Sequence, residues 1–419
     1  MVFDAVSVPL RELSIRITKG TTPTKGEGFA PRGVNYIKSE CITSDGEIDE
    51  SKFSFIDEDT HKKLARSQLR AGNVLFSMAG VYLGKTAIVL PKHLPANTNQ
   101  AVGIITLDES KADSRFIHYT LQSPACRAWI MRSAAQSAQP NFNLQEIGDL
   151  PIPAISLVEQ RGIAETLGAL DDRIENLRQT NATLEAIAAA LFKSWFVDFD
   201  GVAAAEMEES ELGFTPKGWR AGTLADLCEL NASKWTDKKH PPTVRYIDLS
   251  GVSSNRIETV NEFAFGDAPS RARLQLREGD TIVGTVRPGN RAFAYIHEPE
   301  ENLTGSTGFA VLSPNQQHFS SFIYLAATRK EAIERLTNLA DGAAYPAVRP
   351  NVVAETPCVI ATDDVFVEFS GVTQPLLERI VQNSQHASTL AALRDALLPR
   401  LISGQLRVKD AEKIVERAT

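Results

Sequence analysis

The side chains best suited to chemistry in this chain gather in a few segments rich in glycine, lysine, arginine and asparagine. The first, Gly80-Val81-Tyr82-Leu83-Gly84-Lys85-Thr86, resembles a phosphate-binding loop. It has one residue too few between its glycines, because four are needed there for successive backbone N–H groups to wrap a nucleotide phosphate. The segment therefore predicts either a turn that brings Lys85 to a nucleic-acid phosphate or a purely structural turn.

The matching segment later in the chain is Thr285-Val286-Arg287-Pro288-Gly289-Asn290-Arg291. Its arginines could read O6 and N7 of guanine, hold phosphates, or be plain surface charge. Two more segments, Thr18–Lys25 and Asn231–Lys239, interleave lysine with small polar side chains. Such side chains suit contacts to a nucleic-acid backbone and to base edges, and ordinary solvated loops are the alternative.

Amide side chains flank Pro140 in a further segment, and they could read adenine or satisfy nearby backbone groups. In the first half of the chain the candidate DNA-contacting residues are Lys19, Thr21, Thr22, Lys25, Lys38, Ser77, Lys85, Gln139, Asn141 and Asn143. In the second half they are Lys234, Lys238, Lys239, Arg271, Arg273, Arg287, Asn290, Arg291, Tyr345 and Arg349.

No pattern predicts catalysis by this chain alone. The seven histidines are scattered, and none pairs with cysteine or aspartate at metal-ligand spacing, so no metal site is expected. The chain has no nucleophile elbow, no G-x-G-x-x-G loop, and no Asn-Pro-Pro-Phe-type or Asp-Pro-Pro-Tyr-type run. We therefore expect no catalytic residue and no cofactor bound by this chain.

The candidate segments occur twice because the chain repeats itself at a lag of about 206 residues. Leu69–Gly72 matches Leu276–Gly279, and Phe116-Ile117 matches Phe322-Ile323. A repeat this long is a whole domain used twice, since solenoid units run 20–50 residues. Short β-prone runs bounded by Gly, Pro and Asn predict a β-rich domain with short helices.

A long helix with an apolar stripe is predicted after each repeat. Ser156 and Glu159 form a capping box, and apolar positions then alternate at steps of three and four from Leu167 to Trp195. The second seam is weaker, since Arg394 holds one apolar position, for which Leu393 is able to substitute.

Each of these helices needs an apolar partner. We expect the two to pair antiparallel, and packing of each on its own domain is the alternative. Asn181, the polar residue of the first seam, either sets the register of the pair or faces solvent.

Charge permits a nucleic-acid ligand without indicating one. The net charge of the 419 residues is −8, but 151–209 alone carries −7, whereas 1–150 carries +1 and 210–357 carries −1. A basic face on each globular segment is therefore possible. No apolar run reaches 18 residues, no secretory signal follows Met1, and the four cysteines form no C-x-x-C pair. We expect a cytoplasmic protein with free thiols and no membrane partner.

The segments that end the two helices, Ala190–Asp200 and Leu397–Gly404, resemble those of the specificity subunits of type I restriction–modification systems. Pro151-Ile152-Pro153, Ala79–Thr86 and Pro216-Lys217-Gly218-Trp219 also fit, so the resemblance covers nearly the whole chain. The second repeat departs from the pattern: its loop before the helix lacks the Asn-rich form, and its helix start lacks a Glu-Gln pair.

The resemblance implies an α+β fold, with two repeated β-rich α/β target-recognition domains separated by two long antiparallel coiled-coil helices. On this pattern target-recognition domain 1 covers 1–155, spacer helix 1 covers 156–198, a linker covers 199–215, target-recognition domain 2 covers 216–361, spacer helix 2 covers 362–404 and a C-terminal tail covers 405–419.

The resemblance also implies a non-catalytic subunit that recognises an asymmetric bipartite site in double-stranded DNA. It would scaffold two methyltransferase (M) subunits and the restriction/translocase (R) subunits, which would bind S-adenosylmethionine, ATP and Mg. The first seam spans roughly 40 Å at 1.5 Å per residue, close to the turn of about 34–36 Å that separates DNA half-sites. The alternative is an orphan DNA-binding scaffold or regulator that acts without a nuclease.

Overall fold

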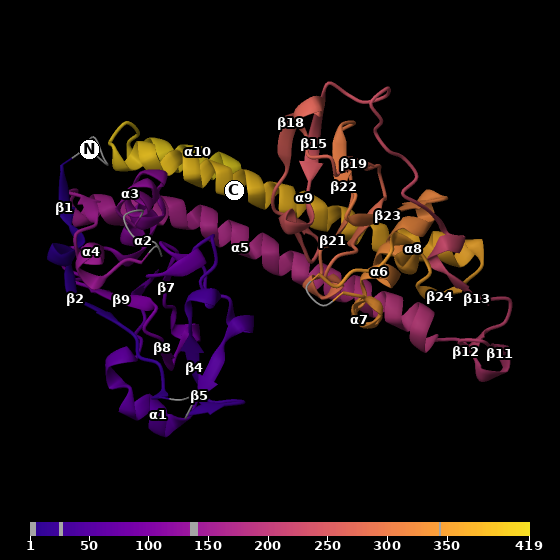
Figure 1. The fold of residues 1–419 in the computed structure, drawn as a ribbon, viewed down its shortest axis with the longest axis horizontal. Coiled ribbons are helices and arrows are strands. Elements are labelled where there is room, and N and C mark those ends of the chain that lie inside the picture. The colour runs from indigo at the N-terminus through magenta and orange to yellow at the C-terminus, as the bar shows by residue number, and fades with distance from the viewer. Residues whose placement is uncertain (1–5, 25–27, 135–140, 343–344) are drawn as a thin grey trace. The chain divides into compact units, whose positions relative to one another are not determined.

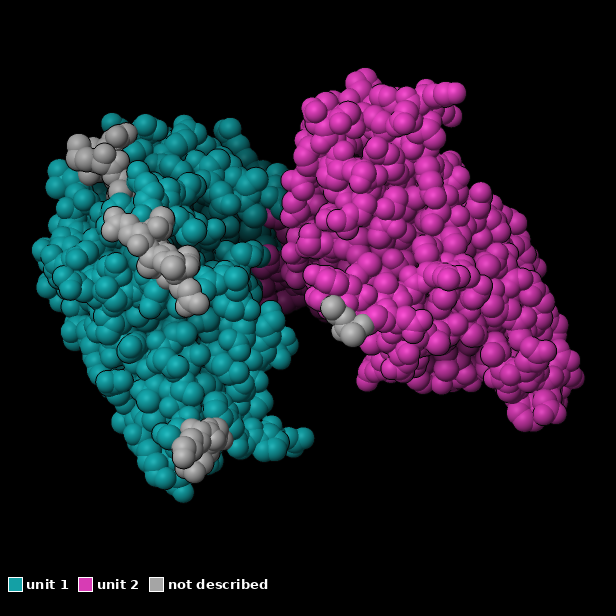
Figure 2. Space-filling view, in the orientation of Figure 1, with its two compact units in different colours: residues 1–174, 388–419 teal, residues 175–387 magenta. Residues whose placement is uncertain are grey.

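The computed structural model of the chain describes residues 6–24, 28–134, 141–342 and 345–419. The chain forms two compact units: unit 1 comprises Met1–Ile174 and Ser388–Thr419, and unit 2 comprises Glu175–Ala387 (Figure 2). These units divide the chain differently from the expected domains, because each unit includes parts of both long helices.

The centre of unit 1 is a four-stranded antiparallel sheet in the order β2–β9–β6–β7. A second sheet has the order β3–β5–β4–β8, in which β4 and β8 run parallel. Buried apolar side chains from both sheets, among them Ile37, Leu75 and Ile104, form a common core. The strands are β2 (Ser14–Lys19), β9 (Val102–Leu107), β6 (Val74–Ser77), β7 (Thr86–Ile88), β3 (Phe29–Ala30), β5 (Ser54–Ile56), β4 (Val34–Ile37) and β8 (Ala96–Thr98).

Short elements complete unit 1 (Figure 1). The pair β1·β10 closes the N-terminal segment against the residues that precede the first long helix. The elements are β1 (Ser7–Pro9), β10 (Pro151–Pro153), α1 (Glu58–Lys63), α2 (Ser114–Gln122), α3 (Pro124–Ala134) and α4 (Leu144–Gly148). The expected strands at 74–77, 86–90 and 102–105 and the helix expected to begin near Phe116 are confirmed.

Unit 2 repeats most of this topology. Its antiparallel sheet has the order β14–β23–β20–β21, and its second sheet, β18–β15–β22–β19, again contains one parallel pair, β15·β22. The strands are β14 (Cys228–Leu230), β23 (Phe309–Pro314), β20 (Thr281–Gly284), β21 (Phe293–Tyr295), β18 (Asn261–Ala264), β15 (Thr243–Ile247), β22 (Leu303–Ser306) and β19 (Ala272–Gln275). The predicted repeat is thus confirmed for the strand order of the antiparallel sheet and for three strands of the second sheet, since β18–β15–β22 matches β5–β4–β8. The edge strands β3 and β19 lie on opposite sides of this set and do not correspond.

The remaining elements of unit 2 include one correction to the sequence analysis. The segment predicted as an exposed linker contains a β-hairpin, β11·β12, whose residues are largely exposed. The elements are β11 (Met207–Ser210), β12 (Gly213–Pro216), β13 (Arg220–Thr223), β24 (Pro357–Ile360), β16 (Val252–Ser253), β17 (Arg256–Ile257), α6 (Ser320–Thr328), α7 (Lys330–Leu339) and α8 (Pro350–Ala354).

Two long helices, α5 (Leu157–Lys193) and α9 (Asp363–Ile402), run side by side through the units (Figure 1). The predicted capping box of α5 is formed: the Glu159 amide donates to Ser156 Oγ at 3.3 Å, and the Ser156 amide donates to Glu159 Oε2 at 3.0 Å. A π-helical turn, Ser194–Asp198, extends α5, and the tail forms α10 (Val408–Ala418). No helix of the described chain is long and apolar enough to cross a membrane.

Within unit 2 the two long helices pair antiparallel. The Asn181 amide nitrogen donates to Ile380 O and to Ser384 Oγ, both at 3.0 Å, and the Asn383 amide nitrogen donates to Asn181 Oδ1 at 2.8 Å. Further along α5, Phe192 packs against Phe369 of α9, at a ring distance of 6.4 Å. Asn181 therefore lies inside the helix pair, and it fixes the register because a shift would leave these amides without partners.

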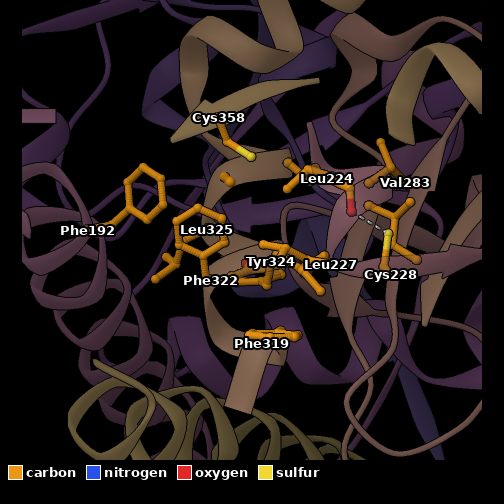
Figure 3. Close-up of a cluster of buried hydrophobic side chains, with 14 of the residues drawn as sticks. Phe192, Leu224, Leu227, Cys228, Val283, Phe319, Phe322, Tyr324, Leu325 and Cys358 are labelled. Atoms are coloured by element: carbon orange, nitrogen blue, oxygen red, sulfur yellow. Dashed lines mark hydrogen bonds between the residues drawn. The ribbon is translucent and has the colours of Figure 1, made fainter. Parts of the chain in front are cut away.

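The aromatic end of α5 belongs to the core of unit 2 (Figure 3). Phe196 is 4% exposed, and its ring lies 4.7 Å from that of Phe322 and 4.9 Å from that of Phe369. Because aromatic rings bury large apolar areas, this cluster ties both long helices to α6. Cys228 lies in the same core and donates to Leu224 O at 3.1 Å.

One contact between α2 and the long helices in unit 1 is polar. Arg394 of α9 pairs with Asp171 of α5 at 2.6 Å, and the Tyr119 hydroxyl of α2 donates to the same carboxylate. Arg394 is only 16% exposed, so the arginine itself occupies its place in the weaker seam. The arginine can remain in the helix pair because two carboxylates, those of Asp171 and Asp395, compensate its charge.

Candidate functional site

The candidate residues of unit 1 meet at one end of its antiparallel sheet. The turn 98–101 is the centre of this end: it receives hydrogen bonds from the Thr21 amide at Thr98 O (3.0 Å) and from the Met78 amide at Ala101 O (2.9 Å). The loop after 140 joins through the Phe142 amide, which donates to Met78 O at 2.8 Å. We call this set, 19–22, 78–85, 98–101 and 141–143, the sheet end of unit 1.

Several predicted residues of this sheet end are exposed to solvent. Lys19 is exposed where β2 ends, and Thr22 is exposed beside Gln100, whose side-chain oxygen accepts a hydrogen bond from the Thr22 hydroxyl. Asn141 is exposed and forms a β-bridge with Ala79. Lys85 is half-buried, and its ammonium lies 5.3 Å from the centre of the Tyr82 ring, a cation–π distance.

Other predicted residues of unit 1 have structural partners. Lys38 pairs with Glu40 at 3.2 Å, and the Asn143 side chain accepts from the Glu146 amide at 2.9 Å as the N-cap of α4. Ser77 has no exposed surface, so we remove it from the candidate interface. Lys25 and Gln139 lie outside the described residues.

The same end of the sheet in unit 2 gathers the arginines. The Thr285 amide donates to Gly308 O at 2.9 Å, and the Val348 amide donates to Thr285 O at 2.9 Å, in the same pattern as in unit 1. Arg271 joins because its carbonyl accepts from the Thr307 amide at 2.9 Å. We call the segment 285–291, together with 345–349, the arginine turn of unit 2.

The arginine turn presents exposed cationic and aromatic side chains. Arg287, Asn290, Arg291 and Arg349 are exposed, and Tyr345 is 72% exposed. The Arg287 guanidinium lies 4.8 Å from the centre of the Tyr345 ring, and that of Arg291 lies 5.1 Å from the Phe293 ring. Stacked guanidinium groups of this kind keep a defined plane, which suits contacts to bases or phosphates.

The remaining predicted residues of unit 2 are Arg273 of β19 and three lysines of the segment 231–239. Lys234 forms a β-bridge with Leu274, and Lys238 and Lys239 are exposed in the turn that begins at Thr236. Arg273 is half-buried, with its guanidinium 4.7 Å from the centre of the Phe265 ring. These lysines are therefore accessible, whereas Arg273 also has a packing role.

Sequence reasoning missed the contacts that support the arginine turn. The Ser254 amide donates to Arg291 O at 2.8 Å, and the next residue, Asn255, donates to Glu185 Oε1 of α5 at 3.2 Å. Burial raises the pKa of Glu185, and the nearby charge of Arg291 opposes this rise. The sequence did contain one signal for these contacts. Ser254 and Asn255 have a left-handed backbone conformation between β16 and β17, and small polar residues of this kind indicate a tight hairpin turn.

These surfaces offer hydrogen-bond donors, positive charge and aromatic rings. Among the residues that the structure describes, no group of three or more His, Cys, Asp or Glu side chains is placed to hold a metal ion. All four cysteines are buried, and burial raises the pKa of Cys126, Cys228 and Cys358 to about 12. The two sheet ends are therefore suited to holding a polyanion and reading its polar edges.

Comparison with known proteins agrees with this geometry. Residues 6–186 match the family model described as the type I restriction modification DNA specificity domain. The chain is 26% identical over 329 residues to the type I restriction enzyme MjaIX specificity subunit of Methanocaldococcus jannaschii, covering 75% of this chain and 74% of that protein. Over residues 6–186 the chain is similar to the DNA specificity domain of type I restriction–modification systems, and over most of its length it is similar to specificity subunits of these systems.

Further similarities extend over most of the chain. The HindI specificity subunit of Haemophilus influenzae is 22% identical, covering 64% of this chain and 71% of that protein. The crystal structure of a type I restriction–modification S subunit from M. genitalium superposes with a TM-score of 0.55 at 17% identity, covering 95% of this chain and 96% of that one. This structural likeness confirms the predicted specificity-subunit fold.

Proposed function

We propose that the chain is the DNA-recognising, non-catalytic subunit of a type I restriction–modification complex. The sheet end of unit 1 reads one part of a bipartite DNA site, and the arginine turn of unit 2 reads the other. Because the two surfaces carry different side chains at the same end of equivalent antiparallel sheets, the two parts of the site differ in sequence and the whole site is asymmetric.

One observation carries this proposal most directly. Two pairs of segments predicted to contact DNA, 78–85 with 141–143 and 285–291 with 345–349, meet at the same end of the same sheet in the two units. The duplicated fold brings these segments together, and the exposed polar and charged side chains that both places carry support their use as binding surfaces. The local charge supports it, since the acidic excess falls in 151–209 and outside the two repeats.

The partners of the proposed complex follow from the same assignment. Two M subunits and the R subunits would dock on this chain and bind S-adenosylmethionine, ATP and Mg, for which this chain shows no recognisable motif. Their polar docking surfaces would include the exposed faces of the long helices and the acidic segment 198–209 that follows α5.

Single-molecule methylome sequencing of cells with and without the gene tests the function. We expect a methylated bipartite motif with two unlike halves to disappear when the gene is removed. Exchanging residues 1–155 for those of another specificity subunit should then change one half only. A motif that persists without the gene, or an exchange that changes both halves, would contradict the proposal.

A further inference from the structure

The arginine turn of unit 2 holds two arginines in a left-handed backbone conformation. The φ angles are 48° at Arg287 and 57° at Arg291. Residues with a Cβ rarely adopt this conformation, because Cβ approaches the following carbonyl oxygen. Strained residues of this kind concentrate at ligand-binding sites, where the surrounding structure enforces them.

Unit 1 shows that the turn itself does not need arginine. The residues 207 positions earlier are Gly80, with φ of 66°, and Gly84, with φ of 78°. Glycine adopts this conformation without a steric penalty. The same turn therefore occurs with the unstrained residue in unit 1 and with arginine at both left-handed positions in unit 2.

The surrounding contacts hold this turn in place. The Arg287 amide donates to Pro346 O at 2.7 Å, and Val286 forms a β-bridge with Ala347. On the other side Arg291 O accepts from Ser254, next to the Asn255 that Glu185 of α5 anchors. Both guanidinium groups also stack over aromatic rings, so backbone and side chain are restricted together.

A phosphate contact would not require this arrangement. A phosphate needs a positive charge within reach, which a flexible lysine such as Lys85 of unit 1 supplies from an ordinary backbone conformation. Guanine instead presents two acceptors, O6 and N7, which a guanidinium meets with two parallel donors only when its plane and position are fixed.

We propose that Arg287 and Arg291 read guanine in the half-site bound by unit 2, and that the glycine turn of unit 1 does not. This inference rests on the proposed function, since it names the base that one of the two surfaces recognises. It predicts at least one guanine whose identity depends on the arginine turn alone.

The test uses the full chain assembled with its methyltransferase subunits. A library of DNA duplexes with randomised sequence is selected for binding, with wild type, R287K, R291K and the control R220K, whose arginine pairs with Asp226 instead. We expect R287K or R291K to lose guanine selection in one half-site, weakening binding to the selected duplex about tenfold or more, while R220K leaves selection unchanged.

Modified DNA separates base reading from phosphate contact. Replacing the selected guanine by 7-deazaguanine removes the N7 acceptor and keeps the phosphates. Wild type should lose about tenfold in affinity on this duplex, and the lysine variant that has already lost guanine selection should lose little more. Equal losses in both proteins would overturn the inference.

Glycine variants test whether misfolding, and not the missing guanidinium group, causes a loss of guanine selection. R287G and R291G copy the residues of unit 1, so they should fold with undiminished thermal stability and still lose guanine selection. If the wild-type complex selects a bipartite sequence and the lysine and glycine variants select the same guanines, the inference fails and the proposed function stands. If the wild-type complex selects no sequence, the proposed function itself fails.

Discussion

Units 1 and 2 have the same strand order in their central antiparallel sheets, but one of their contacts with the long helices differs in chemistry. In unit 1 this contact is the polar set Tyr119, Asp171 and Arg394. The residues at the corresponding places in unit 2 are Leu325, Leu377 and Ala188, all buried. One topology thus accepts either a charged or an apolar contact, because strand pairing fixes the backbone and the side chains need only satisfy one another.

This difference suggests that apolar residues and charged residues have different roles in the two units. Apolar contacts contribute free energy in proportion to the area that they bury, with little demand on geometry. A buried ion pair contributes little net stability, but removing one partner leaves a costly unpaired charge. We therefore expect the aromatic cluster to dominate the stability of unit 2, and the polar set to determine how α2 lies on the helices of unit 1.

The largest effect should come from the aromatic cluster. Phe196→Ala removes a ring that contacts Phe192, Phe322, Phe366 and Phe369, and we expect a loss of about 3–5 kcal/mol. Amide hydrogen exchange should show α6 losing protection while α2 of unit 1 keeps it. Phe196→Leu, which retains most of the volume, should cost much less. Equal loss of protection in α2 and α6 would show that the two units do not unfold separately.

A smaller effect should come from the polar set of unit 1. Asp171→Leu leaves Arg394 without its main partner, and we expect a loss of about 2–4 kcal/mol, seen as faster exchange in α2. The triple variant Y119F/D171L/R394A removes all the polar partners together and approaches the apolar set of unit 2. It should recover most of that stability. A triple variant no more stable than Asp171→Leu would contradict this account.

The smallest of the three effects comes from a position where the repeats differ by one atom. In unit 1, Asn73 accepts from the Arg70 amide at 2.8 Å and donates to Thr106 Oγ1 at 3.1 Å. In unit 2 the residue is Asp280, which accepts from the Arg277 amide at 2.8 Å and has a second oxygen, Oδ1, buried without a hydrogen-bond partner. Burial raises the pKa of Asp280 to about 6, and interactions with Ser313 and Arg277 oppose the rise only in part.

This raised pKa has a definite effect on stability. The folded chain holds the Asp280 proton more tightly than the unfolded chain, so the stability of unit 2 falls as the pH rises from about 4 to about 6 and is level above that range. Asp280→Asn should stabilise unit 2 by about 2–3 kcal/mol at pH 7 and by little below pH 4. Hydrogen exchange of unit 2 between pH 4 and pH 8 measures the gain.

The mirror variant provides a control. Asn73→Asp should give unit 1 the pH-dependent loss that Asp280→Asn removes from unit 2, because it places a carboxyl group in the same buried position. A gain from Asp280→Asn that is the same at pH 4 and pH 8 would show that the titration of Asp280 is not its cause.

The sequence predicted the repeat, the two long helices and the presence of Asn181 in their seam. These features depend on periodic apolar positions, turn residues and spacing, which local physical rules describe well. The sequence did not predict that three segments meet at one end of the sheet, namely 19–22, 78–85 and 141–143. Their contacts are a β-bridge and backbone hydrogen bonds between residues that lie far apart in the chain. Sequence reasoning did not separate the buried Ser77 from its exposed neighbours, since a serine in a short β-prone run fits either face.

Two contacts that sequence reasoning missed have clear physical origins. Arg394 was taken as a weak position of the second seam, because its partner Asp171 lies on the other helix, outside any local pattern. The role of Glu185 in anchoring Asn255 was missed for the same reason, because 70 residues separate the two. Pairs that satisfy each other across the fold are visible only once the chain is folded.

Unit 1 is formed by two stretches that lie far apart in the chain, and this limits which recombinant proteins can fold after genetic exchange. A foreign N-terminal stretch that ended before Ile174 would still have to fit against native residues near the C-terminus. Arg394 would need an acidic partner, and Val408 would need a residue as small as Gly162, where an added Cβ would lie 3.2 Å from its methyl group. New specificities should therefore be inherited most readily between parents that agree at these few positions.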